Sequence, residues 1–139
     1  WTSGDDRAVD DEDAVVERVY DVLPELDERR QAKVQVLSGG QAKMVAIGRA
    51  LALEPDLLIL DEPLEGLAPV VVENLKGYIR DINERGIAVL IAESNVTHVP
   101  EIVDRIYVIE RGEIVASGDP DSVPVSEGVQ MLMQGSGTV

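Results

Sequence analysis

The stretch Leu37-Ser38-Gly39-Gly40-Gln41 and the later stretch Leu57-Leu58-Ile59-Leu60-Asp61-Glu62-Pro63 decide the fold of this chain. Ser38 is a residue type that caps helix N-termini, and an apolar stripe follows it at helical spacing. The first amides of a helix have no intrahelical partner, and two of them belong here to glycines without a side chain. Such a helix start favours an anion such as a phosphate. The stripe consists of Met44, Ile47 and Leu51.

The second stretch predicts a buried strand that ends in two carboxylates. Leu57–Leu60 is a continuous apolar run, and so is Ile87–Ala92, which Glu93 follows. Continuous runs are typical of parallel strands covered by helices on both faces, and ligands of such sheets bind at the carboxyl ends of the strands. Of the acids Asp61 and Glu62, one suits a magnesium ion held through oxygen and water. The other suits a general base for an attacking water.

Helical spacing and prolines predict the helices before the first strand. The apolar residues between Val15 and Leu23 recur at helical spacing, and Pro24 interrupts the run, so we expect one amphipathic helix and a second short one. The helix after Ser38 should end near residues 53–54, because Pro55 has no backbone N–H to donate and restricts the residue before it.

The rest of the chain predicts a crossover and a hairpin. Apolar residues at helical spacing between the two apolar runs predict a helix that connects the two strands. Strand, helix and strand then form a right-handed parallel crossover. Segments 105–110 and 113–117 predict a β-hairpin, Asp119-Pro120-Asp121 begins a short C-terminal helix, and 135–139 form a frayed tail. The helix face consists of Val71, Leu75, Tyr78 and Ile82.

Composition excludes several classes of function. Cysteine is absent, which excludes disulfides and thiolate chemistry, and no apolar run approaches the ~20 residues that span a bilayer. The net charge of −15 opposes unassisted binding to nucleic acid or anionic lipid. We interpret the acidic surface, densest near residues 4–13, as an adaptation to high salt.

A phosphate-binding loop sequence is absent from the chain. The chain contains no Gly-x-x-x-x-Gly-Lys-Ser/Thr sequence, the loop that cradles nucleotide phosphates, and it starts with Trp1. We therefore expect the 139 residues to be a fragment that lacks this loop and that neither binds ATP tightly nor hydrolyses it alone.

Together, the motif Leu37–Gln41, the sequence Gly48-Arg49-Ala50-Leu51 and the strand end Leu57–Pro63 resemble the ABC ATPase family. The loop Glu65–Pro69 and the sequence Glu93-Ser94-Asn95 are most similar to the ATP-binding subunits of branched-chain amino-acid importers. The resemblance implies an α/β fold: the C-terminal part of a P-loop NTPase-type nucleotide-binding domain. It would comprise parallel strands with flanking helices, part of a helical subdomain (1–36) and a core with a C-terminal β-hairpin (37–139).

The resemblance also implies ATP and Mg²⁺ as cofactors and a head-to-tail dimer with a second ATPase subunit. Asp61, in the Walker B motif, would position magnesium through water, and Glu62 would orient and deprotonate the attacking water. The segment Glu65–Ala68 (the D-loop) would face the partner subunit, and residues before Ser38 would dock on a membrane permease at the cytoplasmic face. The signature residues Ser38, Gly39, Gly40 and Gln41 would contact the γ-phosphate of ATP held by the partner.

The switch position departs from the family pattern. Most members place a histidine after the second strand, and the spacing to Asp104 assigns that position to Ser94. His98 lies four residues later, one helical turn or roughly 5.4 Å along a helix axis. The amino-acid importer branch commonly lacks this histidine too, and we take Ser94 as the candidate γ-phosphate contact.

Two alternatives stay open. A chromosome-maintenance or DNA-repair ATPase also carries a signature and an Asp-Glu pair in its C-terminal lobe, but it would need a long coiled coil upstream, whereas residues 1–36 predict only a short helix. A regulatory module without a P-loop, paired with a complete subunit, is the other. The leading hypothesis is an energy-coupling ATPase of an importer for branched-chain amino acids or related small solutes, without nucleic acid as a partner.

Overall fold

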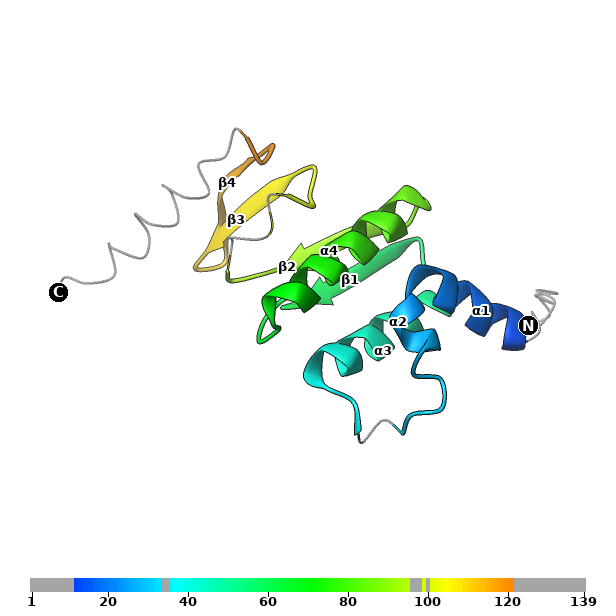
Figure 1. Ribbon diagram of the computed structural model, residues 1–139. Helices are drawn as coiled ribbons and strands as arrows, with labels where there is room; N and C mark the ends of the chain where they lie inside the picture. Colours follow the sequence, from blue (N-terminus) through cyan, green and yellow to red (C-terminus); the bar gives the residue numbers. More distant parts are fainter. Residues whose placement is uncertain (1–11, 34–35, 96–98, 100, 122–139) are drawn as a thin grey trace, which may run out of the picture. The chain divides into compact units, whose positions relative to one another are not determined.

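The computed structural model describes residues 12–33, 36–95, 99 and 101–121, which Figure 1 shows as coloured ribbon. The chain forms two compact units, Trp1–Ile91 and Ala92–Val139. The acidic residues 4–11, His98 and the predicted C-terminal tail lie outside the described residues, as does the predicted last helix beyond Asp121. None of the helices in the described ranges is long and apolar enough to cross a membrane.

Three helices of the first unit precede the first strand in the sequence and pack together (Figure 1): α1 (Glu12–Val22), α2 (Pro24–Asp27) and α3 (Gly39–Leu51). The predicted break at Pro24 is confirmed, with Pro24 in the first turn of α2. Gly48 lets α3 approach the other two closely. A Cβ there would lie 3.0 Å from both Val19 Cγ1 and Leu26 Cδ1, so these two side chains would have to move to make room for a larger residue.

Helix α3 ends at Leu51, slightly earlier than the predicted end at residues 53–54. Ala52 and Leu53 continue as a turn, and Glu54 has a φ of 48°, outside the right-handed helical region. Pro55 follows directly and disfavours the helical conformation for the residue before it. The proline therefore ends the helix as expected, but the chain needs two turn residues to reach it.

A parallel crossover forms the centre of the first unit: β1 (Leu57–Asp61), α4 (Pro69–Glu84) and β2 (Ala88–Ala92). The predicted apolar face of α4 is rotated by about one residue. Leu75 and Ile82 are buried as expected, but Val71 and Tyr78 are half-buried, and Val72 and Ile79 take their place in the core. Each such fully buried aliphatic side chain contributes roughly 1.5–3 kcal/mol to the free energy of unfolding.

Helices cover only one face of the β1–β2 sheet in the described part of the chain. Leu58 and Leu60 are buried, whereas Leu57 is 49% exposed, Ile59 64% and Leu90 53%. The prediction that both faces are covered is therefore wrong for these residues. Side chains alternate between the two faces of a strand, and the described helices bury only the set that includes Leu58 and Leu60.

Glu25 connects the short helix α2 to α4. Its Oε1 accepts hydrogen bonds from Asn74 Nδ2 at 2.7 Å and from the Tyr78 hydroxyl at 3.2 Å. Burial, and secondly the nearby Glu25 carboxylate, raises the pKa of Tyr78 above its ordinary value of 10.0. These two bonds tie the helices before Ser38 to the crossover.

The second unit contains the predicted hairpin, formed by β3 (Ile106–Glu110) and β4 (Glu113–Gly118). Arg111 and Gly112 have φ angles of 50° and 85°, the left-handed values that a tight two-residue hairpin turn needs. A β-bulge between Val108 and Ile109 shifts the register.

Candidate functional site

Ser38 begins α3 with a complete capping box. Its Oγ accepts from the Gln41 amide at 3.2 Å, and its own amide donates to Gln41 Oε1 at 3.0 Å. The hydroxyl still has a proton to donate, because a serine oxygen can accept and donate at the same time. The predicted N-cap is confirmed, and Ser38 and Gln41 are held in one geometry before any ligand arrives.

The two glycines of this motif have different surroundings. Gly39 is exposed, and a Cβ placed on it would meet nothing within 4 Å. Gly40 is buried, and its Cβ would lie 2.9 Å from Val71 Cγ1 and 3.5 Å from Leu67 Cδ2. Gly39 therefore leaves space through which an anion can approach the helix amides, while Gly40 lets α3 pack against the start of α4.

The acids Asp61 and Glu62 lie where the sequence predicts, at the carboxyl end of β1. Asp61 is the exposed last residue of the strand, and Glu62 is half-buried just beyond it. Glu62 has a φ of 46°, a left-handed conformation that residues other than glycine rarely adopt. Such backbone conformations are typical of functional sites, where surrounding contacts maintain them.

Lys43, which is not among the predicted site residues, connects α3 to this turn. Lys43 Nζ donates to the carbonyl oxygens of Glu62 at 2.6 Å, Pro63 at 3.1 Å and Glu65 at 2.8 Å. A signal was present in the sequence, since Lys43 is the only charged residue between Gly39 and Gly48. A lone lysine on a helix is usually solvated, however, so spacing alone gave no reason to place it against the Asp61-Glu62 turn.

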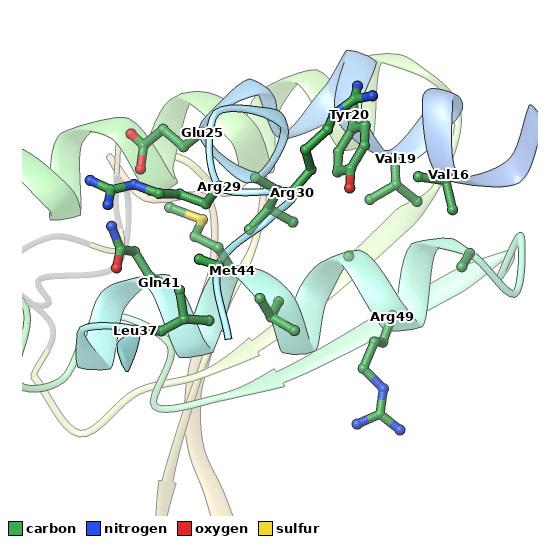
Figure 2. Close-up of a pocket in the computed structure, with 15 residues that line it drawn as sticks. Val16, Val19, Tyr20, Glu25, Arg29, Arg30, Leu37, Gln41, Met44 and Arg49 are labelled. Atoms are coloured by element: carbon green, nitrogen blue, oxygen red, sulfur yellow. The ribbon is translucent and has the colours of Figure 1, made fainter. Parts of the chain in front are cut away.

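A pocket of about 290 Å³ lies beside the same helix (Figure 2). Leu37, Gln41 and Met44 line it from the signature side, and Val16 and Val19 line it from α1. Figure 2 shows the Arg30 side chain against the Tyr20 ring, with the guanidinium carbon 5.1 Å from the ring centroid. The same guanidinium also forms ion pairs with Asp27 and Glu17, so its charge is compensated within the helical part of the chain.

The remaining predicted site residue lies in the second unit. Ser94 is exposed in a bend after β2, while His98 falls outside the described residues. Among the residues that the structure describes, no group of three or more acidic, histidine or cysteine side chains could enclose a metal. Magnesium in nucleotide sites instead keeps several waters and uses one or two carboxylates plus substrate phosphates, and an exposed Asp61 fits that mode.

Comparison with known proteins gives the same family at the level of sequence. The family model described as ABC transporter matches residues 4–65. The high-affinity branched-chain amino acid transport ATP-binding protein BraG of Pseudomonas aeruginosa is 39% identical over 106 residues, covering 76% of this chain and 46% of BraG. The lipopolysaccharide export system ATP-binding protein LptB of Haemophilus influenzae is 40% identical over 101 residues, covering 73% of this chain and 42% of LptB.

Solved structures give the same result for the fold. MJ1267, an ATP-binding cassette of an ABC transporter, matches with a TM-score of 0.78 and 27% identity, over 96% of this chain and 51% of MJ1267. The cbiO1 protein from Clostridium perfringens matches with a TM-score of 0.70 and 30% identity, over 91% of this chain and 52% of cbiO1. The chain spans about half the length of the relatives it matches. By its motifs, its fold and these relatives, the chain belongs to the family of ABC transporter ATP-binding proteins.

Proposed function

We propose that this chain is the C-terminal part of an energy-coupling subunit that binds and hydrolyses ATP for an ABC transporter. One observation carries the proposal: a capped helix start with an open glycine and a strand ending in Asp61-Glu62 occur in one unit, joined through Lys43. The first can bind phosphate, and the second can hold magnesium and activate water. ATP hydrolysis needs both.

Each predicted residue has a proposed role in this reaction. The Ser38 hydroxyl and the amides at Gly39, Gly40 and Gln41 would bind the γ-phosphate of ATP held by a partner subunit, as the family resemblance implies. Asp61 would hold magnesium through water, and the ion would supply charge neutralisation on the phosphate oxygens. Glu62 would orient the attacking water and accept its proton, and Ser94 would donate a hydrogen bond to the γ-phosphate.

We further propose that the transporter imports branched-chain amino acids or related small solutes. BraG supports this assignment, as do the sequences Glu65–Pro69 and Glu93-Ser94-Asn95. LptB supports a second candidate, lipopolysaccharide export, because its identity to this chain is 40% against 39% for BraG. Both relatives are named as ATP-binding proteins of transport or export systems, which favours transport over the DNA-repair alternative.

The test of solute class needs the assembled transporter. We propose that the chain acts in a dimer with a second ATPase subunit on membrane permease subunits, at the cytoplasmic face of the cell membrane. In vesicles carrying that complex, stimulation of ATPase activity by a leucine-loaded binding protein would support import. Stimulation by lipopolysaccharide without any binding protein would contradict import and support export.

The test of the ATPase assignment uses Glu62→Gln in an ATPase-competent subunit, meaning a polypeptide in which this chain is joined to a P-loop half. Loss of a positioned general base lowers turnover by roughly 10²–10⁴-fold, while ATP binding, which does not need that base, should persist. The measurements are steady-state turnover and equilibrium binding of ATP. Unchanged turnover would remove Glu62 from this role. The 139-residue chain alone, which contains no P-loop sequence, should show neither tight ATP binding nor turnover.

A further inference from the structure

Lys43 uses its whole hydrogen-bonding capacity on one turn of the chain. An ammonium group has three N–H donors and accepts none. Its Nζ lies 2.6 Å from the Glu62 carbonyl oxygen, 3.1 Å from that of Pro63 and 2.8 Å from that of Glu65. Bonds from a charged donor are stronger than neutral ones, so three of them hold the turn firmly against α3.

The turn that Lys43 holds is the one that carries the proposed general base. Glu62 has a φ of 46°, and its carbonyl oxygen accepts both from Lys43 and from the Glu65 amide at 3.3 Å. The left-handed conformation is disfavoured for glutamate, so it persists only where surrounding contacts maintain it. Since the backbone conformation sets the direction in which the side chain leaves the Cα atom, these contacts also fix the starting direction of the Glu62 side chain.

We propose that Lys43 is a positioning residue for hydrolysis: it fixes the backbone of Glu62 and couples the signature helix α3 to the turn that extends to Glu65. The inference rests on the proposed ATPase function. Lys43 touches no reacting atom in this scheme. Lys43 acts through Glu62. When a phosphate binds at Ser38 and Gly39, Lys43 transmits any displacement of α3 to the general base and to the segment Glu65–Ala68.

The test replaces Lys43 with methionine, which has a similar stem and no donor, in the ATPase-competent subunit. A displacement of about 1 Å at a catalytic group can cost about 10²-fold in rate, so we expect kcat to fall by roughly 10–100-fold. The KM for ATP should change by less than about twofold, because ATP binding does not use Glu62. Arg80→Met removes one positive charge from an exposed position of α4 and serves as the matched control, with kcat expected at the unmutated value.

A double mutant separates positioning from general damage. If Lys43 acts through Glu62, then Lys43→Met in a Glu62→Gln background should lower kcat by less than about threefold, because the group it positions is already inactive. An equal drop in both backgrounds would overturn the inference. So would an effect confined to KM.

The outcomes also separate this inference from the proposed function. If Glu62→Gln retains full turnover, the proposed function fails. If Glu62→Gln collapses while Lys43→Met keeps full kcat, only the role of Lys43 fails. Should the methionine variant not fold, Lys43→Gln keeps a shorter donor group that reaches fewer carbonyls. A kcat for Lys43→Gln between those of the unmutated subunit and of Glu62→Gln would support the inference, and an unchanged kcat would overturn it.

Discussion

The difference between the two signature glycines leads to a prediction that separates packing from ligand binding. In Gly40→Ala the new methyl group would lie 2.9 Å from Val71 Cγ1, closer than carbon atoms normally approach. Val71 is β-branched and has few alternative rotamers, so either its side chain or the start of α4 must shift. Overpacking of this kind costs about 1–3 kcal/mol in the free energy of unfolding. The better helix propensity of alanine offsets about 1 kcal/mol, which leaves a net loss of up to about 2 kcal/mol.

Gly39→Ala is the matched control, since it makes the same chemical change one residue earlier. Its methyl group would meet nothing within 4 Å, so the free energy of unfolding should stay within about 0.5 kcal/mol of the unmutated value. The same methyl group would occupy space through which we expect the phosphate to approach, so turnover should fall. Urea denaturation and ATPase assays of both variants in the ATPase-competent subunit measure the two effects. A stable Gly40→Ala beside a destabilised Gly39→Ala would refute this account of the motif.

Three further predictions concern pH, salt and the switch position. Because the pKa of Tyr78 is raised in the folded state, its contribution to stability is present below pH 10 and is lost as pH rises through the raised pKa. Urea titrations from pH 8 to 11 should show a decline in the free energy of unfolding that Tyr78→Phe reduces. An equal decline in both proteins would contradict this prediction. The melting temperature should rise from low to molar KCl, because the net charge of −15 repels itself over a Debye length of about 10 Å at 0.1 M and about 3 Å at 1 M; a flat or falling value would remove the salt-adaptation interpretation. In the ATPase-competent subunit, Ser94→Ala should lower turnover more than His98→Ala, because a hydroxyl can hydrogen-bond a phosphate oxygen; the reverse order would place the switch one helical turn later.

Local signals in the sequence predicted much of this structure. Ser38 and Gln41 form a capping box because all their partners lie within one turn, and Pro24 and Pro55 limit helices through their own covalent geometry. The strand ends at Asp61 and Ala92 follow from the lengths of the apolar runs. Features that depend on neighbours within three or four residues were therefore accessible.

Tertiary features were predicted less well. The continuous apolar runs predicted strands covered on both faces, whereas Ile59 and Leu90 are exposed. Lys43 was missed because its partners are 19 to 22 residues away and are backbone carbonyls, which leave no side-chain pattern to read. Whether a helical lysine is solvated or hydrogen-bonded depends on which segment packs beside it, and the tertiary fold determines that segment.

The exposed face of the β1–β2 sheet has a consequence for how this polypeptide behaves in solution. Leu57, Ile59 and Leu90 present apolar surface that favours self-association, while the net charge of −15 keeps neighbouring molecules apart. Acidification towards the isoelectric point near pH 4.2 removes this colloidal repulsion and leaves the attraction. The chain alone should thus be least soluble near that pH, and dilute neutral buffers should keep it dispersed.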